Sequence, residues 1–182
     1  MGYFNSRGLR GSALEELINF TNSHYHDKGL ALIQKIPTPI TPIEVDNQSR
    51  HITLAYFDKK STVDYIGAVQ GVPVCFDAKE SAVDTFSLQN VHDHQMEFMR
   101  DFEKQGGVAF ILIFFSHRDL FYYMSCRELS VFYDRAKAGG RKSIRFEELR
   151  ERFFLKNANN GMVPYLELLK KDLEELDEGK TE

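Results

Sequence analysis

The chain carries two repeating patterns of apolar and polar residues, which outline its expected strands and helices. Short runs rich in β-branched and aromatic residues, bounded by glycine, proline or charge, predict strands. These predicted strands cover residues 30–36, 51–57, 62–69, 72–80, 108–115 and 120–125. Apolar residues at spacings of three and four predict amphipathic helices. The predicted helices cover residues 12–29, 87–105, 126–137 and 165–177.

Two segments stand out from this pattern. Residues 108–115 are apolar without a break, which predicts a central strand covered on both faces. Residues 37–60 hold three closely spaced prolines and few residues suited to a core. Since proline cannot pair in the middle of a sheet, we expect this segment to leave the sheet and return as a protrusion. A loose surface loop would have the same composition.

An acidic hairpin is the strongest chemical signal. Two predicted strands meet at Gln70-Gly71, a two-residue connection that places Asp64 across from Asp77. Side chains alternate along a strand, so Lys79 shares a face with Asp77. Two carboxylates and an ammonium then converge, as suits Mg²⁺ and phosphoryl chemistry. A solvated strand face also alternates charges, but the apolar strand around Asp77 requires that acid to be paired or metal-bound.

Size and composition suit one domain with a sizeable core, at 182 residues and 42% hydrophobic content. No apolar run approaches the ~18 residues of a membrane span, and the first residues lack the apolar segment of a signal peptide. We therefore expect a cytoplasmic protein without membrane contact. Cys75 and Cys126 lie in apolar stretches without CxxC spacing, which predicts buried free thiols.

Charge is unevenly distributed. Residues 167–182 hold seven acids and three lysines, which account for the net charge of −4. Residues 127–145 contain a basic cluster, which is the electrostatic pattern of nucleic-acid binding, although a solvated helix face looks the same. The cluster consists of Arg127, Arg135, Lys137, Arg141, Lys142 and Arg145. Two glycines precede its last three members, as suits close approach of a phosphate or an ordinary turn.

Three polar residues of the predicted helix 87–105, among many, are candidates for contacts with the acidic hairpin or with phosphate. Gln95 interrupts its apolar stripe, so it is either satisfied within the core or aimed at the acidic hairpin. His92 and His94 are two residues apart and are expected on different sides of the helix, which argues against a zinc pair. Polar or phosphate contacts are the interpretation that remains for them.

Three segments, in this order, resemble the RecU-type Holliday junction resolvases: STVDYIGAV with CFDAKE, then FSLQNVHDHQMEFM, then AGGRKSIRFEEL. KIPTPI and Arg10-Gly11 ahead of Leu14-Glu15 also match, so the similarity covers roughly residues 9–150. The resemblance implies a restriction-endonuclease-like α/β fold of the PD-(D/E)xK superfamily. In such a fold a mixed sheet is flanked by helices, and residues 37–60 form a projecting stalk. We expect a nuclease domain at residues 1–165 and an acidic C-terminal helix and tail at 166–182.

The resemblance also implies an activity. It is the nicking of four-way DNA junctions in homologous recombination and DNA repair, by a homodimer that uses Mg²⁺, with Mn²⁺ as a substitute, and that modulates a RecA-type recombinase. The metal ligands implied by position are Thr62, Asp64, Asp77 and Gln95. Lys79 is the implied transition-state stabiliser. The expected DNA contacts are Arg10, Arg141, Lys142 and Arg145.

One position departs from the family pattern, and two other functions fit the same residues. Asp77 stands where the family usually has glutamate, which moves the carboxylate by about 1.5 Å. A related nuclease of the same fold could act on DNA ends or on other branched DNA, and would then show no preference for four-way junctions. A non-catalytic junction-binding or recombinase-regulating protein is the second alternative. The intact pair of acids and Lys79 argue against it.

Overall fold

The computed structural model describes residues 7–57, 62–156 and 161–178, with the side chains of residues 7–12 outside this description. Its helices are α1 (Arg7–Asp27), α2 (Asp93–Lys104), α3 (Cys126–Lys137) and α4 (Tyr165–Glu178). Its strands are β1 (Ala31–Lys35), β2 (Ile40–Asp46), β3 (His51–Phe57), β4 (Tyr65–Val69), β5 (Val72–Ser81), β6 (Thr85–Ser87), β7 (Val108–Phe115), β8 (Leu120–Ser125), β9 (Ser143–Arg145) and β10 (Phe154–Lys156). Short 3₁₀ turns are η1 (Leu88–Asn90), η2 (Phe146–Glu148) and η3 (Glu151–Phe153).

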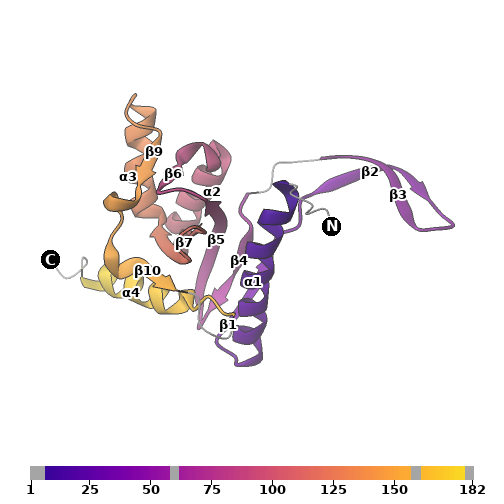
Figure 1. The fold of residues 1–182 in the computed structure, drawn as a ribbon. Coiled ribbons are helices and arrows are strands. Elements are labelled where there is room, and N and C mark those ends of the chain that lie inside the picture. Colours follow the sequence, from indigo (N-terminus) through magenta and orange to yellow (C-terminus); the bar gives the residue numbers. More distant parts are fainter. Residues whose placement is uncertain (1–6, 58–61, 157–160, 179–182) are drawn as a thin grey trace.

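The main sheet has the order β1-β4-β5-β7-β8-β10. Strands β5 and β7 run parallel, and the remaining neighbours are antiparallel, so the sheet is mixed. Helices cover both faces: α1 and α4 meet through Tyr25 and Tyr165 on one, and α2 and α3 pack together on the other (Figure 1). The predicted mixed sheet flanked by helices is confirmed, with β7 in its interior.

A row of aromatic rings crosses one face of this sheet. Tyr65 of β4 stacks on Phe76 of β5 with ring centroids 4.7 Å apart, and Phe76 stacks on Phe110 of β7 at the same spacing. Phe110 in turn stacks on Tyr123 of β8 at 4.5 Å. Such rings bury large apolar areas in a fixed register. Because side chains alternate, this row fixes Asp77 on the opposite face, toward α2.

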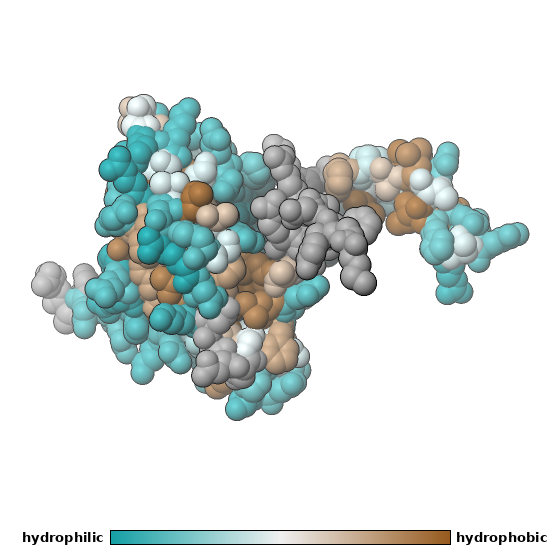
Figure 2. All heavy atoms as spheres, in the orientation of Figure 1, coloured by the Kyte–Doolittle hydropathy of each residue, from teal (hydrophilic) through white to brown (hydrophobic). Residues whose placement is uncertain are grey.

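Within the described part of the chain, strands β2 and β3 pair only with each other, and they extend away from the body as an antiparallel hairpin (Figure 1). The pairing register shifts between Pro42 and Glu44, as expected where proline offers no N–H. Large apolar side chains along the hairpin are exposed, up to 77% for Phe57 (Figure 2). They are Ile40, Ile43, Val45, Ile52, Leu54, Tyr56 and Phe57. Residues 58–60 of the predicted protrusion lie outside the described residues.

Two helices differ from the sequence-based expectation. Helix α1 begins at Arg7, so Ser12 lies inside the helix and the predicted start there is wrong. Helix α4 buries Tyr165, Leu168, Leu169 and Asp172 on one face. An acid on that face was unexpected from the sequence.

Hydrogen bonds tie the buried acid of α4 to the core. Asp172 is 0% exposed and accepts hydrogen bonds from the Tyr123 hydroxyl at 2.9 Å and from Arg127 Nη2 at 2.6 Å. Helix α4 is therefore fastened to β8 and α3.

Cys75 and Cys126 are buried and free, as predicted. Among the described residues, none of the helices has both the length and the apolar character needed to cross a membrane.

Candidate active site

The β4–β5 turn sets the geometry of the site. Gln70 and Gly71 have φ of 49° and 88°, the pair of positive values that a tight hairpin turn with the strand twist requires. The resulting register pairs Tyr65 with Phe76, which brings the next two residues, Asp64 and Asp77, opposite each other. Strand β4 begins at Tyr65 rather than at residue 62 as predicted. Here the backbone N–H groups of Asp64 and Ala78 donate hydrogen bonds to aspartate side chains rather than to backbone carbonyl oxygens of the neighbouring strand.

Asp77 lies at the centre of a hydrogen-bond cluster. Its side chain is 0% exposed, and its Oδ1 accepts a 2.8 Å hydrogen bond from the backbone N–H of Asp64. Its Oδ2 receives Gln95 Nε2 at 2.6 Å and Lys79 Nζ at 3.0 Å. The structure therefore brings both acids, the lysine and Gln95 together, and a buried carboxylate with these donors is compensated.

Asp64 is less buried and is electrostatically strained. Its Oδ2 accepts a 3.0 Å hydrogen bond from the backbone N–H of Ala78. Burial raises the pKa of Asp64, the negative charge of Asp77 raises it further, and Lys79 partly offsets both. Two carboxylates this close repel, and a divalent cation between them would relieve the repulsion.

Gln95 connects the acidic hairpin to the start of α2. It is 6% exposed, and its Oε1 accepts a 3.1 Å hydrogen bond from the backbone N–H of His92 while its Nε2 donates to Asp77. The two possibilities left open by the sequence are thus both present: a backbone partner and an aim at the hairpin. As the amide is turned here, its oxygen faces helix α2 rather than the carboxylates.

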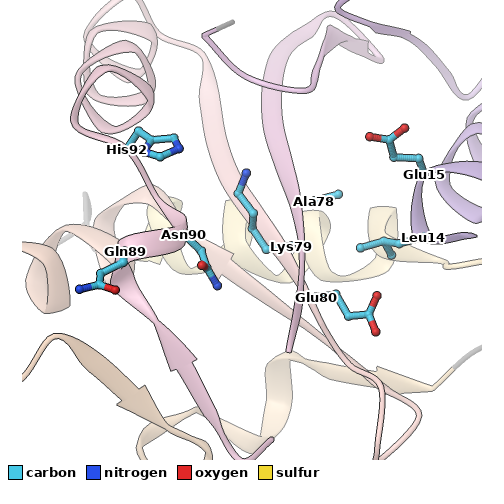
Figure 3. A pocket seen from close by; sticks show the side chains of 8 residues that line it. All are labelled: Leu14, Glu15, Ala78, Lys79, Glu80, Gln89, Asn90 and His92. Atoms are coloured by element: carbon cyan, nitrogen blue, oxygen red, sulfur yellow. The ribbon is translucent and has the colours of Figure 1, made fainter. Parts of the chain in front are cut away.

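Among the described residues, no strand pairs with β5 on its β4 side beyond Phe76, so β5 has an open edge there. Strand β7 still pairs with β5 as far as Ser81. A cavity of about 430 Å³ lies along this edge (Figure 3). Lys79 extends toward His92 on one side of the strand, and Glu15 of α1 lies on the other side (Figure 3). The cavity is lined by Leu14, Glu15, Ala78, Lys79, Glu80, Gln89, Asn90 and His92.

Several of these lining residues were not singled out as site residues from the sequence. Glu80 alternates with Lys79, so its place on the strand was readable, but its role was not. Gln89 and Asn90 lie in η1, which was predicted as part of one long helix. Glu15 forms an ion pair with Lys35 across α1 and β1, a contact that no local pattern reveals.

The available donors fit a hard divalent cation. Within residues 7–57, 62–156 and 161–178, no three His, Cys, Asp or Glu side chains are arranged to hold a metal. The donors present are the carboxylates of Asp64 and Asp77, with half-buried Thr62 just before them and Gln95 beside them. Two carboxylates supplemented by neutral oxygens and water suit Mg²⁺ or Mn²⁺ better than Zn²⁺.

Most of the basic cluster is engaged inside the protein. Ion pairs join Arg127 to Asp172, Lys137 to Asp93, and both Arg135 and Arg141 to Glu148. Arg141 Nε also donates to the carbonyl oxygen of Ser143 at 3.0 Å, so this arginine holds its own loop. Lys142 and Arg145 are exposed. The side chain of Arg10 lies outside the described residues, although its backbone belongs to α1.

His92 and His94 do not face different sides, so that prediction is wrong. Their rings stack with centroids 5.5 Å apart and planes inclined by 12°. Helix α2 begins at Asp93, and His92 precedes it with extended backbone angles of φ −80° and ψ 152°. Helical spacing therefore does not apply to this pair.

The chain is similar to a known protein family over most of its length. Residues 9–171 match the family model described as RecU, Recombination protein U. The chain is 40% identical over 174 residues to a protein of Pediococcus pentosaceus named Holliday junction resolvase RecU, covering 93% of this chain and 87% of the relative. Proteins of the same name from Limosilactobacillus reuteri (38% identical, 89% of this chain and 82% of the relative) and Bacillus pumilus (42%, 78% and 70%) are also similar. The chain therefore belongs to the RecU family.

Proposed function

We propose that this protein is a structure-specific endonuclease that nicks four-way DNA junctions, a Holliday junction resolvase acting in homologous recombination and DNA repair. The observation that carries the proposal is the convergence of Asp64, Asp77 and Lys79 at the open edge of β5. The relatives at about 40% identity bear the same functional name. The open edge lets an extended phosphodiester strand approach these side chains.

The proposed cofactor is Mg²⁺, for which Mn²⁺ can substitute. Asp64 and Asp77 would hold it, with Thr62 and Gln95 as the additional oxygen donors. When bound, such an ion lowers the pKa of a coordinated water and polarises a phosphate oxygen. For Gln95 to contribute its oxygen, the amide must give up its hydrogen bond from the His92 backbone.

The protein's own groups have distinct roles in this proposal. Lys79, whose side chain is 19% exposed, can turn its ammonium from Asp77 toward a phosphoryl oxygen that gains charge. The backbone amides of Asp64 and Ala78 keep both carboxylates oriented without reorganisation. These groups treat all phosphodiesters alike, so they supply chemistry without junction preference.

Junction preference is assigned to the β2–β3 hairpin. It projects from the body and exposes apolar side chains that a solvated loop would not require (Figure 2). Two stiff paired strands with proline can enter a branch point with little loss of freedom. In this proposal the hairpin is the stalk that reads the shape of the junction.

A symmetric junction is resolved by two equivalent cuts, and the described part of one chain contains one such pair of acids. We therefore propose a homodimer, whose twofold symmetry matches that of the substrate. We place the activity in the cytoplasm, together with the DNA. Contact with a RecA-type recombinase belongs to the same proposal, and co-purification with that recombinase tests it.

Cleavage of a labelled mobile four-way junction tests the function. Paired nicks near the crossover are expected with Mg²⁺ or Mn²⁺ and not with EDTA, and linear duplex should be cut far more slowly. Equal cleavage of linear and four-way DNA would contradict the junction assignment. Light scattering of the same preparation, with and without junction, tests the dimer.

A further inference from the structure

A second cavity, of about 590 Å³, lies between the start of α2 and the end of α3. It shares the lining residues Gln89 and His92 with the catalytic cavity, so the two hollows are neighbours. His94, Lys137 and Lys142 also line it. A strand that leaves the open edge of β5 on the His92 side would therefore pass next to this second hollow.

Lys142 is placed in the wall of this cavity by backbone bonds. Its carbonyl oxygen accepts a 3.1 Å hydrogen bond from the Leu88 N–H, and the β6–β9 ladder pairs the adjacent Ser143 with Ser87. The side chain of Lys142 is exposed, and in the described part of the chain no carboxylate forms an ion pair with it. Arg141, its neighbour, is committed to Glu148.

The acid in the cavity wall, Asp93, is already paired with a cation. Asp93 accepts a 2.8 Å contact from Lys137 and a hydrogen bond from the Tyr133 hydroxyl. Both interactions hold the pKa of Asp93 below its usual value, so it stays ionised and paired. An anion entering the cavity then meets the Lys142 ammonium and the two stacked imidazoles rather than an unpaired carboxylate.

We propose that this cavity binds a phosphate of the cleaved DNA strand that lies within about three nucleotides of the scissile linkage, using the charge of Lys142 and hydrogen bonds from His92 and His94. This inference rests on the proposed endonuclease function and deepens it, because it assigns the path of the strand beyond the site of chemistry. The contact positions the strand and carries no base specificity.

A cycle of protein and DNA changes tests the contact. Binding is measured in EDTA with a series of four-way junctions, each carrying one neutral methylphosphonate linkage at a different position. At one linkage in the stated range, neutralisation should weaken wild-type binding about 10-fold, as for loss of one charge-assisted hydrogen-bonded contact. Lys142→Ala should bind the unmodified junction about 10-fold more weakly than the wild-type protein does. Neutralising this same linkage should not weaken the binding of Lys142→Ala any further.

Salt titration and a matched control complete the experiment. Lys142→Ala should reduce the slope of log affinity against log salt by about 0.7 to 0.9, the value for one phosphate contact. Lys142→Arg should retain most of the slope, and His94→Ala should weaken binding at the same linkage. Lys170→Ala removes an equally positive, exposed side chain on α4 and should change neither quantity.

If each neutral linkage weakened the binding of Lys142→Ala by the same factor as that of the wild-type protein, the assignment of this cavity would be overturned. This holds even if the wild-type protein resolves junctions normally. Failure of the wild-type protein itself to nick a four-way junction in Mg²⁺ would instead overturn the proposed function. The two failures are therefore distinguishable in one set of substrates.

Discussion

The backbone N–H of Asp64 donates a 2.8 Å hydrogen bond to Asp77, and the strand that carries Asp77 returns a bond from the Ala78 N–H to the Asp64 carboxylate at 3.0 Å. Each acid thus receives a backbone donor from the opposite strand. Because both strands belong to the main sheet, the spacing of the two carboxylates is fixed by the fold rather than by flexible side chains.

Asp77→Asn should abolish nicking while leaving junction binding intact. The substitution keeps the shape of the side chain but removes the charge that the proposed metal site requires, so a loss of at least about 100-fold is expected. Asp172→Asn neutralises another fully buried aspartate, outside the site, and should keep nicking. Wild-type rates for Asp77→Asn in Mg²⁺ would remove Asp77 from the site.

Gln95→Leu should destabilise the protein through Asp77. The substitution withdraws a donor from a buried carboxylate and an acceptor from the His92 N–H, at a cost of about 1–3 kcal/mol. In an Asp77→Asn background the cost should be smaller, because no buried charge remains. Urea unfolding of the two single variants and the double variant measures this coupling. Strict additivity would show that the two side chains act independently.

Arg141→Ala and Lys142→Ala should separate stability from binding. Arg141 joins Glu148 and the Ser143 carbonyl, both partly exposed to solvent, so its loss should lower stability by about 1 kcal/mol or less. Lys142→Ala should leave thermal unfolding unchanged and weaken DNA binding. Thermal unfolding together with salt titration checks both variants, and the reverse assignment of effects would contradict the structure.

The ionisation of buried Asp172 should lower the free energy of unfolding as pH rises. Burial raises its pKa from the ordinary 3.8, against the opposing influence of Arg127. A raised native pKa contributes stability that is complete below the unfolded-state pKa and is lost as pH rises through the native one. The free energy of unfolding of Asp172→Asn should therefore fall less steeply than that of the wild-type protein as pH rises above about 4. Burial also raises the pKa of Glu103 and the charge of Asp172 raises it further, so the difference between the two proteins includes this coupling. Parallel stability curves would contradict this assignment.

Replacing residues 40–57 by a short Gly-Ser turn should sharply reduce the preference for four-way over linear DNA. The hairpin pairs only with itself, so its removal leaves the main sheet intact. Light scattering must accompany the assay, because exposed apolar residues such as Phe57 and Ile43 can also contribute to a dimer interface. A dimeric deletion variant with the wild-type preference would exclude the hairpin as the reader of the junction.

The features that followed from the sequence are those set by local rules. A two-residue turn and strand alternation were sufficient to place Asp64, Asp77 and Lys79 together, and an unbroken apolar run was sufficient to place β7 inside the sheet. The partners of the basic cluster were not predictable, since Arg127 and Asp172 are 45 residues apart in sequence.

Misplaced element boundaries account for two further differences. The helix predicted from residue 87 begins at Asp93, so His92 lies outside it and helical spacing does not apply to His92 and His94. The open edge of β5 likewise depends on where β4 begins, and a hydrophobic pattern sets strand ends poorly.

Cleavage of one mobile four-way junction by the wild-type protein and by Asp77→Asn, each in Mg²⁺ and in EDTA, tests the central claim most directly. The account predicts paired nicks near the crossover only for the wild-type protein in Mg²⁺, with equal junction binding by both proteins in EDTA. Nicking that survives EDTA or the loss of Asp77, in protein free of contaminating nuclease, would contradict it.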